Sequence, residues 1–339
     1  MSFTDIYGHE NKIDILRKTL IQKRIGHAYL FSGIAAIGKK ALALELIKAI
    51  NCENVDTLHD ACGTCASCRK IQHASHPDVF FVEANGQFIR IDSIRQMQER
   101  TQCKPLEAKR RAFIIDDADK MNEQSANALL KMLEEPSLVN IIILVTSRPY
   151  SLPQTIVSRC QHVRFNPLNT ETVAGFLVAE KGIDQQKALL LAALSGGSIG
   201  QALDLDKEDT VTYRAELLNL LSTTRRQDPF SLINFASFLG QKKKEIGQGL
   251  KILNSFFRDA LIFKEVGNAD MLINQDHIKY ISTCAGGLSG EQILQNIEQI
   301  EKAGDILAQN VNKSLTLETM AFKLNYSESQ ISEAKRAEI

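Results

Sequence analysis

Residues His27 to Leu44 read HAYLFSGIAAIGKKALAL, and this stretch decides the fold of the chain. The apolar run Ala28 to Phe31 predicts a short buried strand, Gly33 and Gly38 enclose a turn, and a helix is expected to follow Lys39. A turn with the spacing Gly33-x4-Gly38-Lys39, between a strand and a helix, is typical of a phosphate-binding loop. The backbone N–H groups of such a loop and the helix N-terminus behind them attract anions, and the lysine adds a positive charge.

One position of this loop departs from the motif. The residue after the lysine is usually Ser or Thr, because its hydroxyl group is a magnesium ligand, and here it is Lys40. An ammonium group cannot ligate a metal ion and repels one. Ala36 and Ile37 also stand where working loops often carry a further glycine. The sequence therefore predicts the outline of a nucleotide site that lacks one functional group.

The composition is that of an ordinary globular protein. The chain has 339 residues, of which 44% are hydrophobic and 24% charged, which predicts two or three domains. Its 40 basic and 40 acidic residues give a net charge of zero, so the whole chain is not expected to bind nucleic acid by electrostatics alone. No apolar run approaches the ~20 residues of a membrane span, and the N-terminus lacks the apolar core of a signal peptide. We expect a cytoplasmic protein without a membrane partner.

Four of the seven cysteines, Cys52, Cys62, Cys65 and Cys68, lie close together in the sequence. Four thiolates at this density are typical of a tetrahedral zinc site. Since all four ligands would come from the protein, the zinc is expected to be structural rather than catalytic. Disulfides are not expected in a cytosolic chain, whereas an iron–sulfur cluster and a vestigial site remain alternatives.

Another apolar run, Ala112 to Asp117, ends in two acids. In a nucleotide-hydrolysing site Asp116 would hold the hydration shell of magnesium, and Asp117 would polarise the attacking water. Most ATPases of this type carry Glu at the second position, so the shorter Asp117 is expected to misplace the base. Thr146 ends the apolar run that begins at Ile141, and Thr146-Ser147 is expected to place a hydroxyl group near a γ-phosphate. The alternative is a strand that simply ends in solvated acids.

About five short apolar runs alternate with helical patterns up to residue 166, the others being 78–83 and 162–165. This alternation predicts an α/β fold with a parallel sheet, helices on both faces and the ligand at the carboxyl ends of the strands. After Asn166-Pro167-Leu168 only helical periodicity is found, first over residues 170–205 and then over 210 to about 325. We expect Lys242 to Lys244 to be a solvated helix start, and the polar last dozen residues to fray.

Over nearly its whole length the chain resembles the bacterial clamp-loader subunits of DNA polymerase III, which belong to the AAA+ class. The motifs that carry the resemblance are His27–Gly33, the four cysteines, His76–Asp78, Ile115–Asp119, Asn127–Pro136, Ser158–Cys160 and Asn310–Lys313. The resemblance implies a P-loop ATPase-like domain over residues 1–166 with a zinc module inserted at 52–68. Two all-α domains are implied to follow it, a helical lid over 167–207 and a helical collar over 208–330.

The family assembles into a five-membered ring that opens a sliding clamp and places it on primed DNA. Its gamma or tau subunits hydrolyse ATP, and a delta subunit is a further member of the hetero-pentamer. Three features argue against hydrolysis by this chain: Lys40, Asp117 and Gly200, which stands where motor subunits carry Arg. The resemblance thus implies a degenerate nucleotide site, with the binding of ATP and magnesium left open, formed by Gly33, Gly38, Lys39, Asp116, Asp117 and Thr146.

Arg159 lies in the triplet Ser158-Arg159-Cys160 and is retained. In this family the arginine of the triplet reaches the γ-phosphate bound by a neighbouring subunit, and such an arginine finger is worth ~10³–10⁵ in rate. The alternative is a surface arginine in an ion pair. We therefore expect a non-motor subunit that supplies Arg159 in trans and takes part in DNA synthesis only as a member of the polymerase holoenzyme. The other hypotheses are a gamma-like ATPase and a free-standing zinc module that binds nucleic acid.

Overall fold

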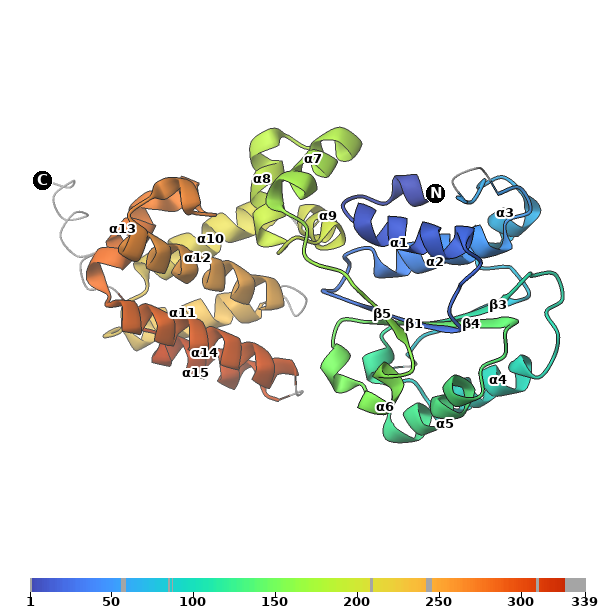
Figure 1. The fold of residues 1–339 in the computed structure, drawn as a ribbon. Coiled ribbons are helices and arrows are strands. Elements are labelled where there is room, and N and C mark those ends of the chain that lie inside the picture. The colour runs from blue at the N-terminus through green and yellow to red at the C-terminus, as the bar shows by residue number, and fades with distance from the viewer. Residues whose placement is uncertain are drawn as a thin grey trace, which may run out of the picture. The chain divides into compact units, whose positions relative to one another are not determined.

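The computed structural model describes residues 2–326 except 56–58, 85, 87, 208–209, 242–245 and 309–310. The expectations for Lys242 to Lys244, for Asn310 and for the last dozen residues lie outside the described residues. The chain forms two compact units, each coloured along its sequence in Figure 1. The sheet unit comprises Met1–Ile183 and Ser195–Ala202, and the helical unit comprises Asp184–Leu194 and Leu203–Ile339. Ser195–Ala202 is called the return segment below.

The sheet unit is built on five parallel strands in the order β2-β3-β4-β1-β5. The strands are β1 (Ala28–Ser32), β2 (Val79–Val82), β3 (Arg111–Ile115), β4 (Asn140–Thr146) and β5 (Gln161–Arg164). The predicted parallel sheet is confirmed. Ser32, the last residue of β1, pairs with Thr146 of β4 and Arg164 of β5. The loop that follows β1 therefore begins beside the carboxyl ends of two neighbouring strands.

Helices cover both faces of this sheet (Figure 1). One face carries α1 (Glu10–Ile21), α2 (Lys39–Asn51) and α3 (Ala66–Gln72), and the other carries α4 (Ile91–Thr101), α5 (Glu123–Glu134) and α6 (Gln154–Val157). Side chains of β1 alternate between the two cores, with Tyr29 and Phe31 in the first and Ala28 and Leu30 in the second. The three inner strands β1, β3 and β4 are buried along their whole length, so they are largely continuous apolar runs in the sequence, whereas the edge strand β5 is polar and only partly buried.

Short elements complete the sheet unit. They are the 3₁₀ helices η1 (Phe3–Asp5), η2 (Ala118–Lys120) and η3 (Pro149–Ser151), the helix α7 (Thr170–Lys181), and the start of α9 (Ile199–Lys207). α7 contacts the N-terminal segment, where the Tyr7 hydroxyl donates a hydrogen bond to Glu180 Oε1 at 2.6 Å. The return segment enters α9 from the turn Ser195–Ser198.

The described part of the helical unit contains no strand. Its elements are α8 (Gln185–Leu194), α10 (Thr210–Thr223), α11 (Pro229–Gly240), α12 (Ile246–Val266), η4 (Ala269–Met271), η5 (Gln275–His277), α13 (Ile278–Gly287), α14 (Gly290–Ala308) and α15 (Lys313–Lys323). Leu253 and Phe257 of α12 lie in its core. No single described helix is long and apolar enough to cross a membrane, and only the bent pair α8 and α9 meets such a criterion by length and composition.

Candidate functional site

The loop between β1 and α2 has the backbone of a phosphate-binding loop. Gly33 lies against Phe165, and a Cβ atom at residue 33 would be 2.6 Å from the Phe165 carbonyl oxygen. Gly38 takes a φ of +103° as the chain enters α2. Ala36 takes a φ of +57°, a left-handed conformation that glycine adopts at lower cost. The loop therefore turns as a glycine-rich loop does, although residue 36 carries a methyl group.

Other parts of the sheet unit anchor the carbonyl groups of this loop. Lys39 Nζ donates to Gly33 O at 2.7 Å and to Ile34 O at 2.6 Å. His9 Nε2 donates to Ile37 O at 3.0 Å, and burial lowers the pKa of His9, which keeps this imidazole neutral at pH 7.

The return segment anchors the two remaining carbonyls. Ser198 Oγ and Gln201 Nε2 donate to Ala35 O at 2.9 and 3.1 Å, and the Gly200 N–H donates to Ala36 O at 3.1 Å. A Cβ atom at residue 200 would lie 2.7 Å from both the Cβ and the carbonyl oxygen of Ala36. This contact requires glycine, so an arginine at residue 200 would force the return segment or the loop to move.

The backbone N–H groups of residues 34–38 differ from the carbonyl groups of the loop, because they are not used in hydrogen bonds. Within the described chain, these donors make no hydrogen bond of good geometry. Their carbonyls are fixed by Lys39, His9 and the return segment, so the loop is held in one conformation with its donors unused. Successive free N–H groups at a helix N-terminus form an anion site. The arrangement fits a phosphate group.

Lys40 joins the loop side of the site to the acids of the neighbouring strands. Its Nζ lies 2.9 Å from Asp116 Oδ2, just after β3, and 2.6 Å from Glu83 Oε1, just after β2. Burial lowers the pKa of Lys40, but the hydrogen bonds to Glu83 and Asp116 outweigh it and raise the pKa above its ordinary value. Lys40 is therefore charged at neutral pH and occupies the carboxylate that a magnesium shell would need. With no hydroxyl ligand at residue 40 either, the site does not fit magnesium.

Asp117 and the hydroxyl group of Thr146 also form hydrogen bonds with other side chains of the protein. Asp117 Oδ2 accepts a hydrogen bond from Lys120 Nζ at 2.8 Å, and this bond raises the pKa of Lys120. The hydroxyl group of Thr146, which is fully buried, donates to Asp119 Oδ1 at 2.5 Å. Neither group is directed at a ligand in this structure.

An open cavity of about 390 Å³ brings the loop and the acids together. It is lined by Ala35, Ala36, Gly38, Lys39, Lys40, Ala41, Asp116, Asp117, Val145 and Ser147. Of the predicted residues, Gly33 and Thr146 are not in this lining, and Ser147 is the hydroxyl residue that is. Burial lowers the pKa of Lys39, against the charges of the acids nearby.

Three residues of the site were not predicted: Glu83, Asp119 and Lys120. The first two had a usable signal, because Glu83 ends one apolar run that was expected to be a strand and Asp119 closely follows another. Polar side chains at the carboxyl ends of parallel strands converge on one edge of the sheet. Lys120 had no such signal.

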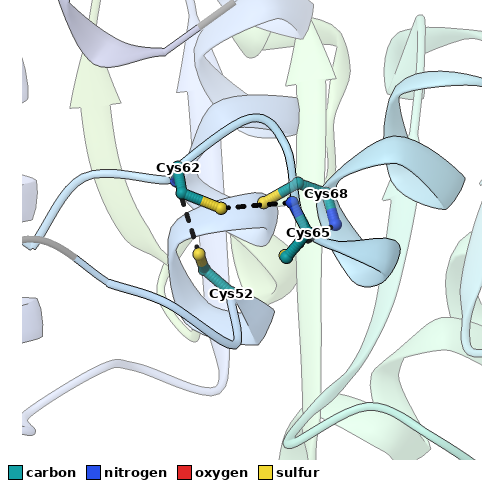
Figure 2. Close-up of side chains that lie close together, drawn as sticks. All are labelled: Cys52, Cys62, Cys65 and Cys68. Atoms are coloured by element: carbon teal, nitrogen blue, oxygen red, sulfur yellow. Dashed lines mark hydrogen bonds between the residues drawn. The ribbon is translucent and has the colours of Figure 1, made fainter.

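The four cysteines form a cluster between α2 and α3, shown in Figure 2. Cys52 follows the last residue of α2, and Cys65 caps the N-terminus of α3 with its Sγ atom. The four Sγ atoms lie within 4.8 Å of one another, close to the ~3.8 Å that separates sulfurs held ~2.3 Å from a tetrahedral zinc.

Backbone N–H groups donate to three of these sulfurs. Cys62 N donates to Cys52 Sγ at 3.4 Å, Cys65 N to Cys62 Sγ at 3.3 Å, and Cys68 N to Cys65 Sγ at 3.4 Å. The bond from Cys65 N lowers the pKa of Cys62 to about 6, against a smaller effect of burial. Burial raises the pKa of Cys52 and of Cys68, so it is the distances among the four sulfurs that fit a structural zinc ion.

Arg159 lies between α6 and β5, at the edge of the sheet where the strands begin. Its Nη2 is 2.9 Å from Glu134 Oε1 at the end of α5, and its Nη1 donates to Thr155 O at 3.0 Å. Its side chain is 37% exposed and that of Glu134 is 50% exposed. The structure thus shows an arginine at the surface, held by one ion pair and one carbonyl group.

Comparisons with known proteins identify the family. The family model of the DNA polymerase III delta subunit matches residues 8–169, and a second model, for the C-terminal part of the delta subunit, matches residues 208–325. The tau subunit of Bacillus subtilis DNA polymerase III is 31% identical over 226 residues, which are 64% of this chain and 39% of tau. A DNA polymerase III gamma subunit-related protein of Thermotoga maritima has 17% identity and a TM-score of 0.41, over 91% of this chain and 97% of that one.

DNA polymerase III subunit delta' of Bacillus subtilis is similar over nearly the whole chain. The two sequences are 31% identical over 315 residues, which are 91% of this chain and 94% of the relative. With a match of this length, and with family models of the same subunit type on both parts of the chain, the chain belongs to the delta' family of DNA polymerase III clamp-loader subunits.

Proposed function

We propose that this chain is a non-motor clamp-loader subunit that supplies Arg159 in trans to a neighbouring ATPase subunit. In this role it assembles with gamma or tau and delta subunits in a five-membered ring and helps to place the sliding clamp on primed DNA during replication. The observation that carries the non-motor role is the ion pair between Lys40 and Asp116 at 2.9 Å. The ammonium group of Lys40 occupies the position at which a motor subunit needs a magnesium ligand.

Two further contacts support the absence of hydrolysis by this chain. Asp117 is paired with Lys120, and the contact between Gly200 and Ala36 leaves no space for an arginine. Loss of a single electrostatic contact to the transition state typically costs about 10²–10³ in rate. Several such losses at one site leave no useful turnover.

The surroundings of Arg159 support a role at a neighbouring site. An exposed ion pair such as the one with Glu134 contributes only about 0–1 kcal/mol, so Arg159 exchanges this partner at little cost. The planar guanidinium binds phosphate oxygens bidentately. A γ-phosphate presented by a neighbouring subunit would be a stronger partner than the Glu134 carboxylate.

The test is ATP turnover by the reconstituted ring with sliding clamp and primed DNA. Arg159→Ala is expected to lower this turnover by about twofold or more, because at least one ATP site loses its arginine finger, while the ring still assembles in gel filtration. Glu134→Gln is the matched control, since it breaks the same ion pair but keeps the arginine, and its turnover should stay near that of the wild type. Unchanged turnover with Arg159→Ala would refute the role in trans.

The alternative function is that of a gamma- or tau-like motor, which the similarity to tau favours. Magnesium-dependent ATP turnover by the isolated chain would establish it. We also propose one structural zinc ion on the four cysteines, supported by the distances among their sulfurs. A lid at 167–207 and a collar at 208–330 are part of the same proposal, as is the cytoplasmic location that a role in replication implies.

A further inference from the structure

We propose that a second cavity of the sheet unit, at the amino ends of the strands, binds a cationic guanidinium or ammonium group. This cavity has a volume of about 140 Å³, whereas a single water molecule takes up ~30 Å³. His27 directly precedes β1 and Asn140 opens β4, so the cavity lies at the opposite edge of the sheet from the phosphate-binding loop. Its polar wall residues are His27, Thr101, Glu135, Ser137 and Asn140.

Two side chains of this wall have buried polar atoms without a hydrogen-bond partner. Asn140 is only 6% exposed, and no donor among the described residues reaches its Oδ1 atom. Its Nδ2 atom donates to the Thr101 carbonyl oxygen over a long distance of 3.5 Å. The Nε2 atom of His27 is also buried, and it too has no partner in the described part of the chain. Because unpartnered buried polar groups are destabilising, a ligand that pairs with these atoms would bind with a gain in free energy.

The charge distribution around the cavity favours a positive ligand. Glu135 lines the cavity, and no Lys or Arg does. Arg159 pairs with Glu134 at 2.9 Å, whereas the Glu135 carboxylate forms no ion pair with any residue that the structure describes. Two helices also end here, since Thr101 is the last residue of α4 and Glu135 is the C-cap of α5. The last carbonyl groups of a helix carry partial negative charge and attract cations.

The hydrogen-bonding groups of the wall favour a cation that carries N–H groups. The Asn140 Oδ1 atom, the Glu135 carboxylate and the Thr101 carbonyl oxygen are acceptors, and His27 Nε2 accepts in the tautomer that is protonated at Nδ1. Guanidinium and ammonium groups have several N–H donors and no acceptor, and their charge strengthens each hydrogen bond. Such a group belongs either to a free small molecule or to a side chain that a partner protein presents.

The experiment is an NMR titration of the full chain labelled with ¹⁵N-histidine. The chain has seven histidines, and the His27 signal is assigned by its loss in His27→Gln. Methylguanidinium is the free probe, and a blocked Gly-Arg-Gly peptide presents the same group on a side chain. Methylguanidinium is expected to shift the His27 signal and leave the other histidine signals in place. An equal response to the peptide would identify a partner's arginine as a possible source, and a response to methylguanidinium alone would identify a free small cation.

Controls separate hydrogen bonding from charge. Tetramethylammonium has the same charge but no N–H donor, so it should not shift the His27 signal at the same ionic strength. Asn140→Leu removes the buried acceptor at similar side-chain size, and Glu135→Gln removes the negative charge. Each is expected to weaken methylguanidinium binding by about tenfold. Glu123→Gln is the matched control, because Glu123 is an exposed acid in the first turn of the same helix, and it should bind as the wild type does.

The proposal would be overturned by a His27 signal that neither probe shifts, or by an equal shift with tetramethylammonium. Unchanged affinity of either variant at the cavity would overturn it as well. If Asn140→Leu does not fold, by circular dichroism, the wild-type titrations and the exposed Glu135→Gln still decide. Because the readout is binding of a small cation by the isolated chain, failure here is distinguishable from failure of the role of Arg159, which is measured in the ring.

Discussion

Replacement of Gly200 by alanine is expected to destabilise the sheet unit by about 1–4 kcal/mol. The added Cβ atom would lie 2.7 Å from the Cβ and from the carbonyl oxygen of Ala36, against an ordinary contact distance of about 3.5–4.0 Å. Neither neighbour is the end of a flexible side chain, so the loop or the start of α9 must move by about 1 Å. Overpacking of this kind costs about 1–3 kcal/mol.

The same movement weakens the hydrogen bonds from Ser198, Gly200 and Gln201 to the loop carbonyls. Since a hydrogen bond contributes about 1 kcal/mol net, their partial loss adds about 1–2 kcal/mol. In the opposite direction, alanine is favoured over glycine in a helix by about 1 kcal/mol. Overpacking and weakened hydrogen bonds together exceed the gain in helix propensity, which gives the expected net destabilisation of about 1–4 kcal/mol.

The assay is urea unfolding of the full chain followed by circular dichroism, with Gly175→Ala as the matched control. Gly175 lies in α7 of the same unit, and a Cβ atom there would meet no atom within 4 Å. Gly175→Ala should therefore stabilise by up to about 1 kcal/mol, and the two substitutions should have opposite signs. Equal stabilisation by both would refute the close contact between the return segment and the loop. Gly200→Arg, the residue that the resemblance implies for motor subunits, should lose stability without gaining ATP turnover.

Zinc content and stability are expected to change together. Cys65→Ser should remove the metal, as measured by atomic emission, and should lower the free energy of unfolding by about 4 kcal/mol. Equal stability of a zinc-free chain would argue against a structural role. Asp78 is 1% exposed and pairs with Arg111 at 3.4 Å. Burial raises the pKa of Asp78, but hydrogen bonds from the backbone N–H groups of residues 106–108 and the charge of Arg111 outweigh it and hold the pKa below its ordinary value. Asp78→Asn should therefore lower the free energy of unfolding by about 3 kcal/mol at pH 7. The difference from the wild type should shrink as the pH falls below about 4, because the wild-type carboxylate then takes up its proton. A difference in urea unfolding that does not change with pH would contradict this. Ala36→Gly relieves a φ of +57° and should stabilise by about 0.5–1 kcal/mol in the same assay; a fall in stability would contradict this.

The inner strands of the sheet, β1, β3 and β4, are predictable from the sequence because they are buried on both faces. The apolar run from Ile141 to Thr146 predicts a strand, and the structure has β4 at Asn140–Thr146. The glycine spacing likewise predicts the loop, and the spacing of the cysteines predicts a cluster of sulfurs. These are local properties, in which the residues that carry the signal are close in sequence to the structure that they form.

Long-range partners are not predictable in this way. Lys40 is expected from the sequence only to remove a metal ligand, whereas in the structure it reaches Glu83, 43 residues further along the chain. Gly200 is expected only to lack an arginine, whereas its segment reaches the loop through Ser198 and Ala35, which are 163 residues apart. Neither contact has a periodicity or a motif, since each depends on how the completed sheet brings separate segments together.

The contacts of Lys40 and of the Gly200 segment show that these residues connect parts of the sheet unit, in addition to lacking the groups needed for hydrolysis. In nucleotide-driven switches the γ-phosphate and its metal ion hold separate segments together and release them on hydrolysis. In this chain Lys40 joins the start of α2 to the acids after β2 and β3, and the return segment is bonded directly to the loop. Connections that would otherwise require a bound nucleotide are thus made by the protein alone. It follows that the loop and the return segment should keep one conformation without a bound nucleotide.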